Sequence, residues 1–139
     1  MNRPLYETKE DLERERQIIE RITPFGVKAQ KLPIKNHLDF AMVRDGKVTA
    51  LIEVRCRSTK MGDYDTFMGA LDKVLHAREL SKACGCPAFM FVQWTDKLAY
   101  MDFNEPYTVG FGGRNNMRDS QDRALMAYFD INVFKEWER

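Results

Sequence analysis

The chain has 139 residues, and a hydrophobic fraction of 44% supplies enough apolar side chains for the core of one domain. Its 22 lysines and arginines nearly balance 21 aspartates and glutamates, which argues against a basic protein that coats nucleic acid through net charge alone. The sequence shows no signal-peptide pattern, no apolar run of bilayer length and no disulfide or zinc-site spacing among its cysteines, so one cytoplasmic domain spanning residues 1–139 is expected.

The N-terminal half is predicted to contain one helix followed by three strands. Residues 5–22 suit a helix, because apolar residues recur at helical spacing until Thr23-Pro24 ends the pattern. Three extended segments follow, at residues 27–32, 38–43 and 48–57. Between the last two lies Asp45-Gly46, a strong hairpin signal, so these two strands should be antiparallel neighbours.

The C-terminal half is predicted to contain a second helix and further strands. Asp65-Thr66 can cap a helix that runs to about residue 83, with an apolar stripe made by Phe67, Ala70, Leu71, Val74 and Ala77. Strands are expected at residues 88–94, 98–103 and 127–134, and the glycine-containing segment 111–116 is expected to be a loop. The order of elements predicts an α/β fold.

Three acidic residues occupy positions where the apolar pattern places the core. Glu15 lies at the centre of the apolar stripe of the first helix. Asp39 lies between Leu38 and Phe40, and Glu53 lies inside a run of aliphatic strand residues. Because side chains alternate along a strand, Arg55 projects to the same side as Glu53.

The hairpin predicts where two of these acids lie relative to each other. A turn centred on Asp45-Gly46 sets Asp39 nearly opposite position 52, so a bulge or modest register shift would bring Asp39 and Glu53 together. Two adjacent carboxylates at the edge of a core repel each other unless a proton or a cation lies between them. Hard oxygen ligands suit Mg²⁺ or Mn²⁺, and such a site is typical of phosphodiester hydrolysis.

Asp39, thirteen intervening residues and then Glu53-Val54-Arg55, set within this order of elements, resemble the PD-(D/E)XK nuclease superfamily. Residues 38–58 look most like those of archaeal Holliday-junction resolvases and related phage or restriction-like nucleases. The resemblance covers about residues 10–95. It implies a restriction-endonuclease-like αβββαβ core, with a mixed central sheet flanked by helices and extra C-terminal β structure. It also implies that an acid on the first helix joins the site, and Glu15 is the matching position.

The sequence departs from the family pattern at Arg55, where the motif usually ends in lysine. Lysine can orient water or help to deprotonate it, whereas arginine stays protonated and can only position water or stabilise developing charge. Lys73 or Lys60 could supply the missing amine, and the sequence does not choose between them.

Several polar residues are candidates for nucleic-acid contact. Arg55, Arg57 and Lys60 form a basic cluster at the end of the third strand, which could hold phosphates or form a solvated turn. Gln93 could face the site or be a buried, hydrogen-bonded glutamine. The glycine-containing loop with Arg114 could follow a nucleic-acid backbone. The predicted contacts are Arg57, Lys60, Lys73, Gln93 and Arg114.

The leading hypothesis is a Mg²⁺-dependent (or Mn²⁺-dependent) deoxyribonuclease that cuts DNA internally. Glu15, Asp39 and Glu53 would bind one or two metals, and Arg55 would orient water or the scissile phosphate. A homodimer is reasonable, because cutting both strands of a duplex usually requires two sites. One alternative is a catalytically inactive protein of the same fold that binds nucleic acid or acts in assembly. Another is a small-molecule enzyme on an unrelated α/β fold.

Overall fold

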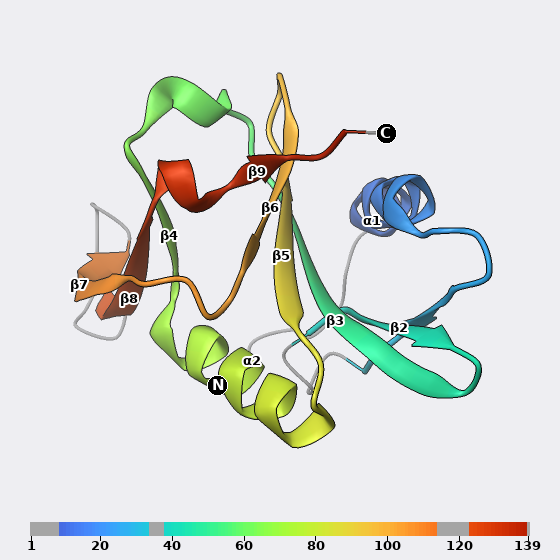
Figure 1. Ribbon diagram of the computed structural model, residues 1–139. Helices are drawn as coiled ribbons and strands as arrows, with labels where there is room; N and C mark the ends of the chain where they lie inside the picture. The colour runs from blue at the N-terminus through green and yellow to red at the C-terminus, as the bar shows by residue number, and fades with distance from the viewer. Residues whose placement is uncertain (1–8, 34–37, 114–122, 139) are drawn as a thin grey trace.

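The computed structural model describes residues 9–33, 38–113 and 123–138. Its central feature is a six-stranded sheet with the strand order β1-β2-β3-β5-β6-β9, accompanied by a three-stranded sheet with the order β4-β8-β7 (Figure 1). The elements are α1 (Lys9–Ile22), β1 (Lys28–Lys31), β2 (Phe40–Arg44), β3 (Lys47–Cys56), a 3-10 turn (Met61–Asp63), β4 (Thr66–Ala70), α2 (Leu71–Cys84), β5 (Ala88–Gln93), β6 (Leu98–Asp102), β7 (Thr108–Gly113), β8 (Arg123–Asp130), a second 3-10 turn (Ile131–Val133) and β9 (Lys135–Glu136).

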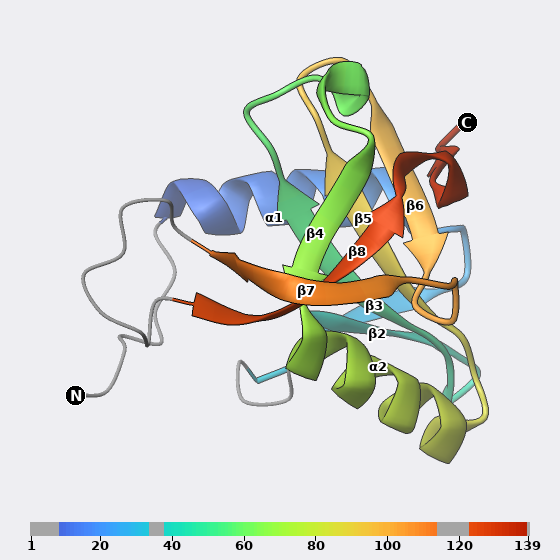
Figure 2. The ribbon, with the colours of Figure 1, turned by 90° about the vertical axis from the view of Figure 1, so that its left-hand side faces the viewer.

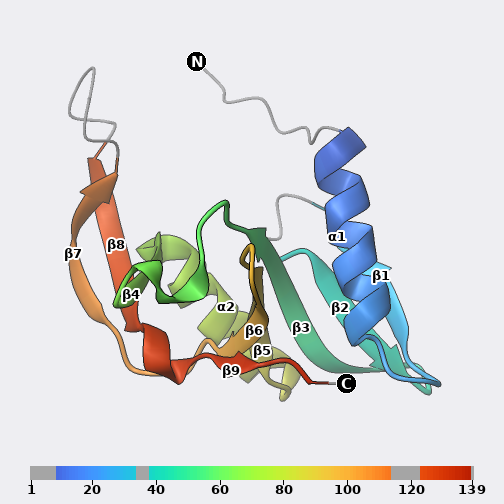
Figure 3. The same ribbon diagram turned by 90° about the horizontal axis from the view of Figure 1, so that it is seen from above.

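The central sheet is mixed and is covered on both faces. Strands β3 and β5 are parallel, whereas β1 with β2, β2 with β3 and β5 with β6 are antiparallel pairs. Helices α1 and α2 lie on opposite sides of this sheet (Figure 3). The small sheet stands on the same side as α2 (Figure 2). Parallel pairing of β3 and β5 requires a crossover connection, which β4 and α2 supply.

Alternation along β3 divides the core into two clusters. Ile52 and Val54 pack with the isoleucines of α1, whereas Leu51 packs with Val74 and Ala77 of α2. A strand buried on both faces carries apolar residues on both, which explains the aliphatic run that contains Glu53. Whatever side chain occupies position 53 therefore faces α2.

The connection between β2 and β3 is a two-residue turn. Asp45 and Gly46 both have positive φ angles, of 52° and 76°, as expected for a tight hairpin turn. Beyond it Val43 pairs with Val48 and Met42 pairs with Ala50, so Thr49 is an extra residue that shifts the register by one. The hairpin predicted from the sequence is confirmed, and it contains a β-bulge.

Replacing Gly46 with valine is expected to lower the free energy of unfolding by about 1–2 kcal/mol, because a β-branched side chain is strained at positive φ. Chemical denaturation of the purified protein measures this change. Asp45→Asn is the matched control and should be near neutral, since asparagine tolerates this conformation. Equal stability of Gly46→Val and Asp45→Asn would show that the turn does not hold the hairpin.

The prediction of a helix from Asp65-Thr66 is wrong for its first turn. Residues Thr66–Ala70 form β4, and α2 begins only at Leu71. Phe67 is buried while its neighbours Thr66 and Met68 are exposed, and the strand pairs with β8. The apolar spacing of this segment fits both structures, and pairing with a distant strand decides between them.

Two further predictions in the C-terminal third need correction. Residues 111–113 belong to β7, which pairs with β8, whereas residues 114–116 of the expected loop lie outside the described residues. The strand predicted at 127–134 ends at Asp130, whose side chain accepts a hydrogen bond from the Asn132 N–H and begins a 3-10 turn. The three cysteines are free. None of the described helices is both long and apolar enough to cross a membrane.

Candidate active site

Glu53 lies in the middle of β3 with no solvent exposure. Because its neighbours Ile52 and Val54 point toward α1, the Glu53 side chain points toward α2. A buried carboxylate loses its hydration, so its charged form must be stabilised by partners or by a cation.

Asp39 is positioned beside Glu53 by the shifted register of the hairpin. Phe40 pairs with Ile52, so the same register one step further sets Asp39 opposite Glu53. The backbone N–H of Asp39 donates to the Ile52 carbonyl at 3.0 Å, and Asp39 Oδ2 accepts from the Val54 N–H at 2.7 Å. These two bonds hold the Asp39 backbone and carboxylate against β3. The register shift at the β-bulge sets Asp39 opposite Glu53, and the bonds keep it there.

Two cations contact the same oxygen of Glu53. Lys73 Nζ, from α2, lies 2.6 Å from Glu53 Oε2, and Arg55 Nη2 lies 2.7 Å from it. The other oxygen, Oε1, is buried and has no hydrogen-bond partner among the described residues. One carboxylate oxygen is therefore neutralised from α2 and β3, while the other remains available.

Burial, together with the nearby Asp39 carboxylate, raises the pKa of Glu53 to about 7 against the opposing charges of Arg55 and Lys73. A cation at the unpartnered oxygen would stabilise the ionised form of Glu53, which burial disfavours. The donor set of Glu53 Oε1 beside a second carboxylate fits a small divalent ion. No group of three or more potential ligand residues gathers in the described segments, so two carboxylates would form the protein's part of such a site.

The family of the chain follows from comparison of its sequence with protein-family models. The model described as "Phage putative PDDEXK endonuclease" matches residues 1–137. The chain belongs to this PDDEXK endonuclease family. The resemblance that Asp39 and Glu53-Val54-Arg55 indicated is thereby confirmed. No curated protein matches the sequence significantly.

The fold of this PDDEXK protein is similar to that of a solved nuclease structure. The Hjc Holliday junction resolvase of Archaeoglobus fulgidus, an archaeal hyperthermophile, superposes with a TM-score of 0.61 over 92% of each chain. Sequence identity is 13%, so the likeness is one of fold. The predicted restriction-endonuclease-like α/β class is confirmed, with β4, β7 and β8 forming a separate small sheet.

Glu15 of the PDDEXK chain is buried, in agreement with its place in the apolar stripe of α1. Its carboxylate pairs with Lys31 Nζ at 2.5 Å, and Lys31 lies over the ring of Phe40. Phe40 packs in the α1 cluster, whereas Glu53 faces α2. The structure therefore does not bring Glu15 together with the other two acids, and its role as a third metal ligand stays a prediction.

The other predicted contact residues of this PDDEXK protein are spread around the end of β3. Arg57 lies over the Phe67 ring, 4.7 Å from its centre. Lys60 is exposed at the start of the first 3-10 turn, and no contact in the described residues joins its amine to either acid. The amide of Gln93 donates to the Trp94 carbonyl at 2.7 Å, on the α1 side of the sheet. Arg114 lies outside the described residues.

The sequence did not decide whether Lys60 or Lys73 supplies the amine that is missing at Arg55. The structure places Lys73 against Glu53. Helical spacing contains a signal for it, because Lys73 precedes the buried Ala77 by one turn and so lies near the inner face of α2. Whether Lys73 rather than Lys60 contacts Glu53 also depends on which face of the sheet α2 covers. Only tertiary packing determines that face.

Proposed function

We propose that this protein is a divalent-metal-dependent DNA endonuclease whose Asp39 and Glu53 hold Mg²⁺ or Mn²⁺. The observation that carries the proposal is the buried Glu53 Oε1, which has no partner in the described residues and lies beside Asp39. The family description and the resolvase-like fold support a nuclease. The match over residues 1–137 supports a single nuclease-like domain.

The side chains around the two acids can each take a defined part in phosphodiester hydrolysis. A divalent ion, when bound, would lower the pKa of water and neutralise charge on the phosphate. Arg55 stays protonated and can hold a non-bridging phosphate oxygen. Lys73 can orient the attacking water through Nζ, the part that the motif lysine would otherwise take. The Val54 N–H keeps the Asp39 carboxylate in place.

A cavity beside the acids supports a nucleic-acid substrate. It has a volume of about 310 Å³ and lies between β3, α2 and the small sheet. Its lining includes the cations Arg55, Arg57 and Lys73, together with Phe67 and Met126. A positively charged cavity of this size suits the phosphate backbone of one strand. We propose DNA as the substrate, and a homodimer as the state that cuts both strands of a duplex.

A catalytically inactive nucleic-acid-binding protein is the second candidate, and one observation favours it. Arg55 and Lys73 both contact Glu53, so two fixed cations could replace a metal ion in stabilising the buried charge. In that case the site would be electrostatically complete without a divalent ion and would not need one to fold or to bind nucleic acid.

Metal binding distinguishes the two candidates. For the endonuclease, Mn²⁺ at about 100 times its dissociation constant should stabilise the wild-type protein by about 2.7 kcal/mol, measured by calorimetry or thermal unfolding. The Asp39→Asn variant should show little of this effect, because it has lost one anionic ligand. Cleavage of supercoiled DNA should stop on addition of EDTA. Equal Mn²⁺ stabilisation of both proteins would contradict the proposed site.

A further inference from the structure

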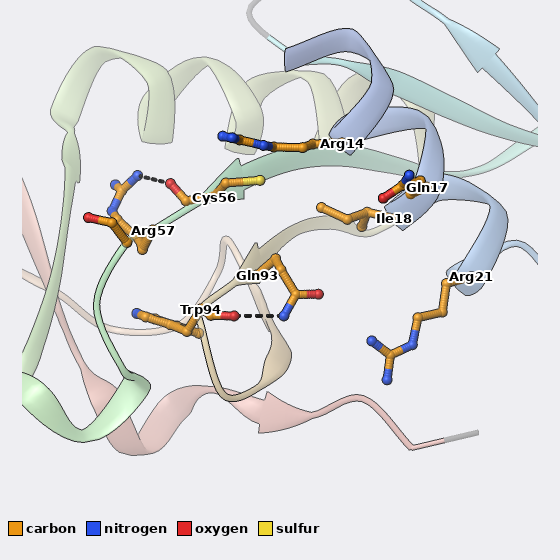
Figure 4. A pocket seen from close by; sticks show the side chains of 9 residues that line it. Arg14, Gln17, Ile18, Arg21, Cys56, Arg57, Gln93 and Trp94 are labelled. Atoms are coloured by element: carbon orange, nitrogen blue, oxygen red, sulfur yellow. Dashed lines mark hydrogen bonds between the residues drawn. The ribbon is translucent and has the colours of Figure 1, made fainter. Parts of the chain in front are cut away.

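A second and larger cavity lies on the other face of the central sheet. Its volume is about 640 Å³, and it is bounded by α1 and by the ends of β3 and β5 (Figure 4). We call it the α1 groove. Its lining residues are Arg14, Gln17, Ile18, Arg21, Cys56, Arg57, Ser58, Gln93 and Trp94.

The charge of the α1 groove is positive. Three arginines line it, Arg14 and Arg21 from α1 and Arg57 from the end of β3, and no carboxylate is among its lining residues. The other side of α1 differs, because Arg16 there forms ion pairs with Glu13 and Glu20. The same helix therefore carries an ion-paired arginine on one side, whereas Arg14, on the groove side, forms no ion pair within the described residues.

Two of the groove arginines lack a counter-ion. In the segments that the structure describes, neither Arg14 nor Arg57 forms an ion pair with a carboxylate. Desolvation lowers the pKa of Arg57, and the charge of Arg55 lowers it further. An anion bound beside Arg57 would stabilise the charged guanidinium and so offset both effects.

Polar uncharged groups complete the lining. Gln17 and Ser58 face the groove from α1 and from the segment after β3, and Gln93 is fixed by its bond to the Trp94 carbonyl. Arginine, amide and hydroxyl side chains are the groups that bind phosphate and sugar oxygens in nucleic-acid complexes. Trp94 is almost fully buried, so it offers no open ring for base stacking.

The α1 groove connects with the cavity beside the two acids at one residue. Arg57 lines both cavities, whereas Arg55 and Lys73 line only the cavity beside the acids. A strand held at that cavity could therefore continue past Arg57, around the end of β3, and reach Arg14 on the opposite face of the sheet.

We propose that the α1 groove is a second binding site for the phosphate backbone of the nucleic-acid substrate, remote from the two acids. This inference rests on the proposed function, because it takes nucleic acid as the substrate. It assigns Arg14 and Arg21 to substrate binding, with Gln17 as a neutral neighbour, and it adds α1 to the contact surface.

The test is equilibrium binding in EDTA, where no cleavage occurs, by fluorescence anisotropy with a single strand and with a duplex of the same sequence. The plot of log K against log salt has a negative slope. Each lost phosphate contact should make it shallower, by about 0.7 for the single strand or about 0.9 for the duplex. For Arg14→Gln with Arg21→Gln, this corresponds to binding about 15- to 30-fold weaker at physiological salt.

Arg16→Gln is the control on the same helix: it removes one positive charge, against two in the double variant, at a place where Glu13 and Glu20 already neutralise it. A loss in the double variant that is absent from Arg16→Gln supports the α1 groove, and the probe with the larger loss identifies single-stranded or duplex nucleic acid as its occupant. Equal binding by wild type and double variant would overturn the inference, as would a wild type that binds neither probe.

The binding result is independent of the cleavage result. Thermal unfolding should give wild-type stability for the double variant, because both arginines are exposed. If the proposed endonuclease activity fails, wild type and Asp39→Asn show the same absence of cleavage while the binding difference persists. If only the α1 groove fails, wild type cuts DNA and the double variant binds as tightly as wild type.

Discussion

Asp39→Asn is expected to reduce the rate of DNA cleavage by at least about 10³-fold, equivalent to about 4 kcal/mol of transition-state stabilisation. The substitution removes one of the two adjacent carboxylates and leaves the rest of the site in place. Asparagine keeps an oxygen that can accept the Val54 N–H, so the hairpin should stay in register. The measurement is single-turnover cleavage of supercoiled and branched DNA in Mg²⁺ and in Mn²⁺.

Asp39→Ala makes a useful comparison, because it removes the same charge and also the hydrogen bond. We expect the same loss of cleavage, together with about 1–3 kcal/mol of lost stability from the unpartnered Val54 N–H. Cleavage that survives in either variant at the wild-type rate would come from a contaminating nuclease and would defeat the assignment of Asp39.

Lys73→Met is expected to slow cleavage by about 10²-fold or more, because it removes the amine nearest to Glu53 while keeping the length of the side chain. The loss should appear mainly in the rate of the chemical step, with DNA binding reduced by at most about one phosphate contact. Single-turnover rates and anisotropy binding separate the two effects. Because Arg55 still contacts Glu53, the variant should remain folded.

Two further variants test whether Lys73 takes the place of the motif lysine. Lys60→Met is the matched control and should cut at nearly the wild-type rate, since Lys60 is exposed and makes no described contact with either acid. Adding Arg55→Lys to Lys73→Met restores an amine at the motif position and should recover part of the rate. A Lys60→Met loss equal to that of Lys73→Met would refute the assignment.

The predictions that agree with the structure depend on residues close together in the sequence. Asp45-Gly46 determines the turn and so makes β2 and β3 neighbours, and the aliphatic run around Glu53 marks a strand buried on both faces. Alternation then places Arg55 on the same side as Glu53. The position of Asp39 required one more fact, the extra residue at Thr49, which the sequence allowed without requiring.

The predictions that failed concern segments whose partners are distant. Thr66–Ala70 and Thr108–Gly113 become strands because β8 lies between them, and nothing within either segment specifies that pairing.

Glu15 was correctly expected to be buried, but apolar periodicity does not show which face of the sheet a helix covers. The α1 groove was missed for the same reason, since Arg14 and Arg21 resemble ordinary surface charges until β3 and β5 are placed beside them.

The regular ladder beyond the extra residue of β3 makes the chemistry of this protein sensitive to chain length in one short stretch. Side chains on a strand alternate with a period of two, so one residue added between Ala50 and Glu53 would set Asp39 opposite Ile52 and turn Glu53 to the other face of the sheet. The turn at Asp45-Gly46 carries no such restriction, because lengthening it leaves the ladder beyond Thr49 unchanged. Relatives of this chain can therefore vary the length of the hairpin tip, whereas the spacing from Asp39 to Met42 and from Ala50 to Glu53 must be conserved to keep an acid facing an acid.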